Sequence, residues 1–201
     1  MFYKRILTLS IVAALLLLIV GLLPVHGEEE IYNKVVRLHV LANSDSEKDQ
    51  AVKLKVRDAI LDITVPLLQD CKTKEEAVQC LEDNQILFIK TAQSVLREQG
   101  FDDAVSIEMG LEDYPTRTYD SLCFPAGEYI SMRVCLGEGE GQNWWCCLFP
   151  PLCLGAATVS EKTAEDACIS VGFTPTQYKI ITENDKPVYR ARFKILEYFG
   201  K

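Results

Sequence analysis

The chain has 201 residues, about the length of one ordinary domain, and it carries 29 acidic against 21 basic residues, a formal net charge of -8. This excess of acid argues against a general nucleic-acid binder, because affinity for phosphates rests largely on Lys and Arg. Hydrophobic residues make up 48% of the chain and charged residues 25%, which is typical of a globular protein. Only two histidines are present, which excludes a histidine-rich metal site, and we expect no metal and no cofactor.

The N-terminus has the pattern of an export signal. Lys4 and Arg5 precede an apolar run over residues 6–23, and a small residue, Gly27, comes before three glutamates. The run is also close to the length of roughly 18 residues at which a membrane-spanning helix becomes plausible. Residues 1–27 are therefore either a cleaved signal peptide or a membrane anchor. In both cases we expect residues 28–201 to form one extracytoplasmic domain.

The first elements of this domain are a strand and a helix. Apolar residues alternate with other residues over 34–41, which predicts a strand. A polar turn follows, in which Ser44 and Glu47 have the spacing of a capping box that begins a helix. Pro66 should end or kink that helix near Val65.

A second helix is predicted from Thr73, with Glu76 as its capping-box partner and Gly100 as the residue that closes it. Beyond Gly100 the apolar period changes from about 3.6 to 2, which predicts strands over residues 105–111 and 130–136.

The C-terminal part is less regular. We predict a strand over 178–182 and a turn at 184–185, whereas residues 155–172 remain unassigned. Residues 187–199 fit either a strand or a closing helix, and Pro187 at their start favours the helix. The elements predict a single α+β domain with two N-terminal helices packed on a mainly antiparallel sheet.

The glycine-rich segment 137–141 does not fit a phosphate-binding loop. It contains Glu138 and Glu140, which repel phosphate, and no Lys-Ser or Lys-Thr pair follows it. We expect a flexible turn after a strand.

Both tryptophans of the chain lie directly after this turn. At strand spacing, Trp144 and Trp145 point to opposite faces, so one indole enters the core and the other is available to a partner.

The eight cysteines allow three interpretations. Zinc is weakly supported because there is no C-x-x-C pair. A cysteine nucleophile would have only His39 as its base in the exported chain. Disulfides are the usual fate of cysteines in exported proteins, and Cys146 and Cys153 flank a six-residue loop that a disulfide would close.

Polar residues also gather after the first strand. His39, Asn43, Asp45 and Asp49 fit either a hydrolytic site or a turn and helix cap below a histidine on the sheet's second face. The second interpretation is favoured, because turns use these residue types so often.

Several of these segments resemble the stage II sporulation protein R family. The resemblance lies in residues 37–46, 49–50 and 54–58, then in 114–119, 125–129 and 137–153, and finally in 192–195. Cys147 departs from the apolar residue expected there, and residues 155–177 match nothing in the family pattern. The residues that carry the opening motif are Arg37, His39, Asn43, Asp45, Asp49, Arg57 and Asp58.

The resemblance implies a signalling protein of endospore formation rather than an enzyme. Such a protein is exported from the forespore into the space between the two membranes, with transient membrane contact through its N-terminal segment. There it activates a membrane-bound aspartic protease of the mother cell, which processes the sigma-E precursor. The competing interpretation is a secreted cell-wall hydrolase that uses His39 with Cys146 or a carboxylate.

A signalling protein needs a contact surface, and the aromatic segment after the glycine loop combines rigidity with a large apolar area. We expect the partner to bind Asn143, Trp144, Trp145, Phe149, Pro150 and Pro151.

Overall fold

The computed structural model describes residues 3, 5–6, 31–119, 122–152 and 161–182. The chain divides into two units, Gly27–Asp185 and a second one made of Met1–His26 and Lys186–Lys201, and the elements below belong to the first. None of the helices in the described ranges is long and apolar enough to cross a membrane. The apolar run beyond Ile6 lies outside these ranges, so the choice between cleaved signal and anchor stays open.

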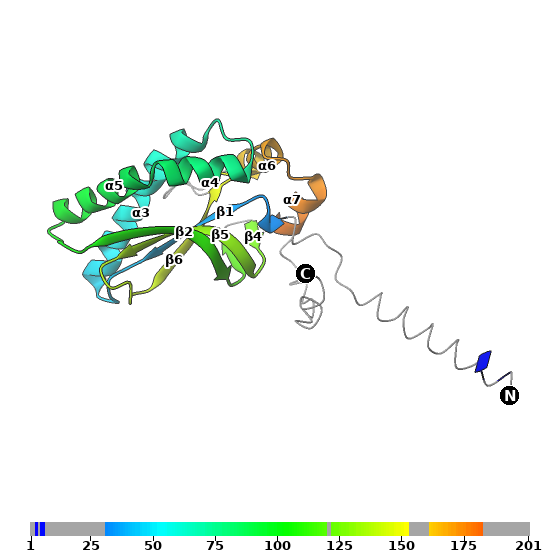
Figure 1. Ribbon diagram of the computed structural model, residues 1–201, viewed down its shortest axis with the longest axis horizontal. Coiled ribbons are helices and arrows are strands. Elements are labelled where there is room, and N and C mark those ends of the chain that lie inside the picture. Colours follow the sequence, from blue (N-terminus) through cyan, green and yellow to red (C-terminus); the bar gives the residue numbers. More distant parts are fainter. Residues whose placement is uncertain (1–2, 4, 7–30, 120–121, 153–160, 183–201) are drawn as a thin grey trace. The chain divides into compact units, whose positions relative to one another are not determined.

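Four strands form a sheet in the order β2-β5-β1-β6 (Figure 1). The strands are β1 (Val36–Leu41), β2 (Val105–Tyr114), β5 (Gly127–Leu136) and β6 (Asn143–Phe149). β1 and β5 pair in parallel, whereas β2 with β5 and β1 with β6 are antiparallel, so the sheet is mainly antiparallel as predicted. Two short strands, β3 (Arg117–Tyr119) and β4 (Leu122–Phe124), form a separate hairpin.

Three helices pack on one face of this sheet (Figure 1). They are α3 (Glu47–Leu68), α4 (Lys74–Asp83) and α5 (Gln85–Glu98). The alternation in β1 explains the arrangement, because Val36, Leu38 and Val40 are fully buried against the helices while Arg37 and His39 point to the other face. The predicted α+β class with N-terminal helices on the sheet is confirmed.

The first helix begins and ends differently from the prediction. Its N-cap is Ser46, whose hydroxyl accepts from the Asp49 amide at 3.1 Å, and not Ser44. Ser44 instead donates its hydroxyl to the Asp49 carboxylate and accepts from the Ser46 amide at 3.1 Å, so its oxygen serves the turn before the helix. The helix also continues through Pro66 to Leu68, so the proline lies inside the last turn and does not end the helix at Val65.

The second predicted helix is two helices. Thr73 caps the first as expected, accepting from the Glu76 amide at 3.2 Å, and Gly100, with φ of 80°, lies just beyond the end of the second. The break is at Asn84, whose φ of -103° and ψ of 12° leave the helical region and whose side-chain amide donates to the Cys80 carbonyl at 2.8 Å.

Two further helices follow, α6 (Glu161–Ser170) and α7 (Pro175–Thr182). The predicted strand over 178–182 is therefore wrong. Thr174 accepts from the Gln177 amide at 3.2 Å, and the Gln177 side chain accepts from the Thr174 amide at 2.9 Å, so a complete capping box begins α7. The turn at 184–185 and the helix at 187–199 lie outside the described residues.

Candidate functional site

His39 lies at the centre of the sheet's second face, away from α3, α4 and α5. Its side chain is almost buried, and both ring nitrogens have partners. Nδ1 is 2.6 Å from the carboxylate of Glu112 on β2, and Nε2 is 2.7 Å from the side-chain oxygen of Asn143 on β6. Three strands therefore fix the orientation of this imidazole.

Trp145 extends the same face toward the edge strand. It is the β6 neighbour of His39, and its indole stacks on the imidazole at 5.3 Å with an angle of 25° between the planes. The guanidinium of Arg117, from the β3–β4 hairpin, lies 3.9 Å from the centre of the indole, a cation–π contact. Imidazole, indole and guanidinium thus form one continuous group, which we call the second-face cluster together with Glu112 and Asn143.

Arg37 lies beside this cluster and is completely buried. Its Nε donates to the Cys146 carbonyl and its Nη2 to the Tyr119 hydroxyl, both at 2.8 Å. Four aromatic rings surround the guanidinium, with centroids between 4.4 and 5.7 Å away: Tyr114, Tyr119, Phe124 and Tyr129. The faces of these rings carry partial negative charge and offset part of the cost of burying the cation. Arg37 is thus a structural link between β1 and the hairpin.

Burial also fixes the state of two phenols near Arg37. It raises the pKa of Tyr114 and of Tyr119 above the usual value of 10, because the ionised phenolate would lose its hydration. Tyr114 pairs with the Ser131 hydroxyl at 2.7 Å. Both phenols are therefore neutral hydrogen-bonding groups and not bases.

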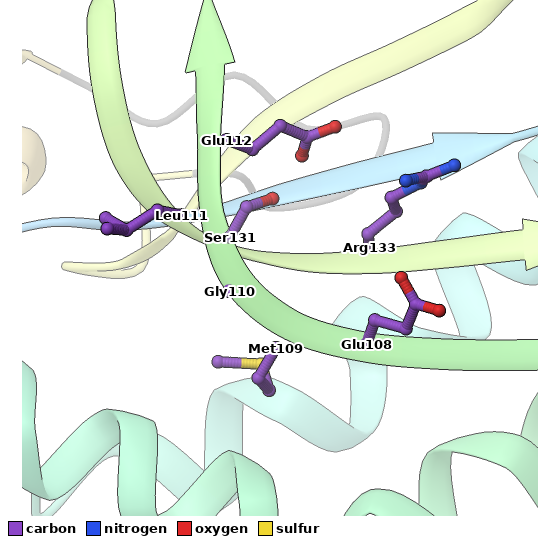
Figure 2. Close-up of a pocket in the computed structure, with 7 residues that line it drawn as sticks. All are labelled: Glu108, Met109, Gly110, Leu111, Glu112, Ser131 and Arg133. Carbon is purple, nitrogen blue, oxygen red and sulfur yellow. The ribbon is translucent and has the colours of Figure 1, made fainter.

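A small pocket of about 110 Å³ opens next to Glu112, and Figure 2 shows the residues around it. Gly110 on β2 faces Ser131 on β5, and a methyl group added to Gly110 would meet no atom within 4 Å. The space therefore exists because β2 has no side chain at this position. The lining residues are Glu108, Met109, Gly110, Leu111, Glu112, Ser131 and Arg133.

The polar residues after β1 hold the glycine loop instead of forming part of this cluster. The Asn43 side chain accepts from the Glu138 amide at 3.0 Å, and the Ala42 carbonyl accepts from Gly141 at 2.9 Å. A Cβ on Gly137 would lie 2.2 Å from the Asn43 side chain, and one on Gly141 would lie 2.3 Å from the Ser44 carbonyl. The segment is a turn, as predicted, but it is packed against β1 and needs glycine for that approach.

Asp49 is buried at the start of α3, whereas Asp45 in the preceding turn is exposed. The Ser44 hydroxyl, and then the Asn43 and Ser46 side chains, hold the pKa of Asp49 below its usual value against the opposing effect of burial. The structure thus places Asn43 and Asp49 in the turn and the cap, apart from His39. These contacts support the interpretation as a turn and helix cap over that as a hydrolytic site.

Arg57 and Asp58 form an ion pair on α3, with a shortest nitrogen–oxygen distance of 2.6 Å. The Arg57 guanidinium also lies 4.8 Å from the Trp144 ring, so it covers the indole on the helix side of β6. The two tryptophans therefore occupy opposite faces, as predicted, and each is half-buried below an arginine.

The other residues of the expected partner surface differ in exposure. Asn143 is exposed, whereas Phe149 and Pro150 are buried and Pro151 is half-buried. The surface that this segment offers to a partner is that of Asn143, Trp144, Trp145 and Pro151. That a partner binds here stays a prediction.

Cys146 is disulfide-bonded and fully buried. Its predicted partner, Cys153, lies outside the described residues, so this pairing remains a prediction. Cys146 pairs with Leu38 on the helix-facing side of the sheet, whereas His39 points to the second face. A hydrolytic pair of Cys146 and His39 is therefore wrong, because the sheet separates the two side chains.

The carboxylate beside His39 is Glu112, which sequence reasoning did not find. Arg117 and Tyr114 were seen only as part of a motif, without a role. Glu112 and Tyr114 reach His39 through the pairing of β2 with β5, and Arg117 reaches Trp145 through the position of the hairpin. Both are long-range features. The alternation along β2 is the only local signal, since it puts Glu108, Gly110 and Glu112 on one face.

Comparisons with known proteins decide the family. A model of the stage II sporulation protein R family matches residues 32–159, more than half of the chain. The chain belongs to this family. It is 36% identical over 121 residues to the stage II sporulation protein R of Bacillus subtilis (strain 168), which is 60% of this chain and 54% of that relative. The chain thus matches about half the length of this curated relative, and no solved structure matches.

Proposed function

We propose that this chain is an exported signalling protein of endospore formation that activates a membrane-bound aspartic protease, which in turn processes the sigma-E precursor. The observation that carries the proposal is membership of the stage II sporulation protein R family over residues 32–159. The pattern of an export signal before this region is consistent with action outside the producing compartment. In this proposal the chain itself catalyses no reaction.

The contacts of His39 support a binding role over a hydrolytic one. A general base must reach the proton of a nucleophile or of a water molecule. In His39, one ring nitrogen faces a carboxylate and the other an amide oxygen, so the imidazole holds three strands together.

We place the contact with the protease on the second-face cluster and the adjacent edge of the sheet. β6 is the last strand in the order, and Trp145 and Arg117 are half-buried residues of the two types that most often dominate binding energy at interfaces. Glu112 Oε2 and Arg117 Nε also have no hydrogen-bond partner among the described residues. A partner that binds over Trp145 would cover an aromatic face flanked by one acidic and one basic group.

The two tryptophans provide a matched test of this surface. Trp145→Ala removes the indole of the second face, and Trp144→Ala removes its neighbour on the helix side. Both variants lose buried area and stability, but we expect only Trp145→Ala to abolish precursor processing in cells that co-express the protease and the precursor. An anchor of this kind contributes about 2 kcal/mol or more, so affinity should fall more than tenfold.

Secreted amount and melting temperature are measured for both variants, so that processing is compared per folded molecule. Arg117→Ala, which leaves both indoles in place, should also reduce processing. Native processing by folded Trp145→Ala and Arg117→Ala would move the signalling surface elsewhere.

A further inference from the structure

β2 is the outer strand of the sheet on the side away from β6, and no other strand in the described ranges lies along its outer edge. Its 10 residues pair with β5 in unbroken register, so no bulge turns this edge away from a neighbour. Leu111, on the same strand, is 64% exposed. A long, regular edge with an exposed apolar side chain is the kind of strand to which another strand can add.

Two hydrogen bonds identify the backbone groups of β2 that point outward. The Gly137 amide donates to the Ala104 carbonyl at 2.8 Å, so Ala104 and every second residue after it face β5. The Gln85 side chain donates to the Ile107 carbonyl at 2.5 Å, so Ile107 and the residues that alternate with it face the outer edge. Gln85 thus covers the edge at Ile107. The next residues with outward N–H and C=O groups are Met109, Leu111 and Asp113.

The two faces of this edge differ in chemistry. On the helix side, Met109 packs against the hydrophobic core, whereas Leu111 beyond it is exposed. On the second face, Glu108 and Glu112 come two residues before and after Gly110, and both line the pocket at this glycine. Figure 2 shows the two glutamates extending to the same side of β2, while Leu111 points away from them. An added strand would therefore meet an apolar side chain on one face and carboxylates on the other.

The pocket determines which side chain fits at one position of the added strand. A residue opposite Gly110 has its side chain on the second face, because directly paired residues share a face. Gly110 has no side chain, and a methyl group there would meet no atom within 4 Å, so a long side chain of the added strand can cross it. The diagonal neighbours of that side chain are Glu108 and Glu112, at a separation of about 7–8 Å that long side chains span.

The charges around this position favour a cation. Arg133 also lines the pocket, but the carboxylates of Glu108 and Glu112 outnumber its single guanidinium. Glu112 uses Oε1 for His39, and its Oε2 has no hydrogen-bond partner in the part of the chain that the structure describes. The position opposite Gly110 therefore suits lysine or arginine.

We propose that β2 is a strand-addition site for an extended segment of a partner protein, with a lysine or arginine opposite Gly110 and apolar residues opposite Met109 and Leu111. Main-chain hydrogen bonds to β2 provide the affinity, and the basic side chain provides the specificity. A second copy of this chain does not fit. Antiparallel pairing centred on Gly110 would place Glu108 opposite Glu112 of the other copy, and like charges in such a pair are destabilising.

A binding experiment on the full-length chain tests the proposal without a sporulation assay, so its outcome is independent of the proposed function. The probe is the synthetic peptide Val-Thr-Val-Lys-Val-Thr-Val, amidated at its C-terminus and labelled with fluorescein at its N-terminus. Fluorescence anisotropy measures its affinity. We expect the same peptide with a central glutamate to bind at least about threefold more weakly, because two attractive diagonal pairs become repulsive.

Two further measurements locate the bound peptide. Methylation of the amides of the two valines beside the lysine removes main-chain donors of the added strand, and this peptide should not bind. Hydrogen-exchange mass spectrometry should show slower exchange in fragments that contain β2 when the lysine peptide is bound, and unchanged exchange in fragments that contain β6.

Matched variants of the chain test the charge preference. Glu108→Lys, at an exposed position, should invert the preference, so that the glutamate peptide binds more tightly than the lysine peptide. Glu128→Lys makes the same charge change at an exposed position of β5 opposite Asp113, on the helix side, and should retain the wild-type preference. Equal affinities for the lysine and glutamate peptides, binding of the methylated peptide, or protection of β6 in place of β2 would overturn the proposal, as would the absence of binding.

Discussion

Around the guanidinium of Arg37, the rings of Tyr114, Phe124 and Tyr129 occupy positions that water would fill at a surface cation. Its two hydrogen bonds run to the backbone of β6 and to the hairpin, so one side chain connects three elements. A change at this residue should act on stability, because the side chain is fully buried.

Arg37→Ala should lower the free energy of unfolding by about 3 kcal/mol or more, since it opens a cavity and removes two buried hydrogen bonds. Urea denaturation measures the loss. Arg97→Ala, at an exposed arginine of α5, is the control and should change stability by no more than about 0.5 kcal/mol. Equal losses in the two variants would contradict the structural role of Arg37.

Asp49 predicts a specific dependence of stability on pH. Its folded pKa lies below the ordinary value of 3.8, so the native state binds this proton less readily than the unfolded chain does. The resulting stability is present above about pH 3.8 and is lost as the pH falls through the folded pKa.

Asp49→Asn should therefore lose less stability than the wild type between pH 5 and pH 2, as measured by thermal melts across that range. Asp62→Asn, at an exposed position of the same helix, serves as the control and should follow the wild-type curve. Parallel curves for wild type and Asp49→Asn would show that Asp49 has no such role.

Among the elements, the glycine loop depends on its contact with the turn after β1. Gly141→Ala places a methyl group 2.3 Å from the Ser44 carbonyl, a backbone atom that moves little. We expect a loss of about 1–3 kcal/mol in urea denaturation. Gly110→Ala, where a methyl group meets nothing within 4 Å, should stay within about 1 kcal/mol of wild type. The contact is unimportant if both variants unfold at the same urea concentration.

Local patterns predicted the elements best where one period dominates. The period of two located β1, β2 and β5, and the Thr73 cap located α4. The break at Asn84 was missed because the apolar stripe continues from α4 into α5 across a polar residue that bonds back to Cys80. In α7, the residues Tyr178, Ile180 and Ile181 favour a strand by propensity, but the capping box at Thr174 and Gln177 decided the outcome.

The site was predictable only in part, because most of its contacts depend on strand pairing between distant segments of the chain. His39 and Trp145 stand out in the sequence as one of two histidines and one of two tryptophans. Glu112 and Arg117 complete the cluster only through the register of β2 on β5 and the return of the hairpin over the sheet. No spacing along the chain encodes those contacts.

At the scale of the whole molecule, the helix layer and the second face have separate roles in this account. The helices complete the hydrophobic core, whereas the second face presents Trp145, Arg117 and Glu112. Substitutions in the helix layer should therefore change stability and yield, and those of the half-buried second-face residues Trp145 and Arg117 should change signalling.

The central claim is that this chain acts through a protease and not as one. The most direct measurement expresses the exported chain, the membrane-bound aspartic protease and a tagged sigma-E precursor together in a host without other sporulation proteins. Immunoblotting should show the shortened precursor only when all three are present and the catalytic aspartate of the protease is intact. An uncut precursor with all three proteins present, or a precursor cut when that aspartate is replaced, would contradict the account.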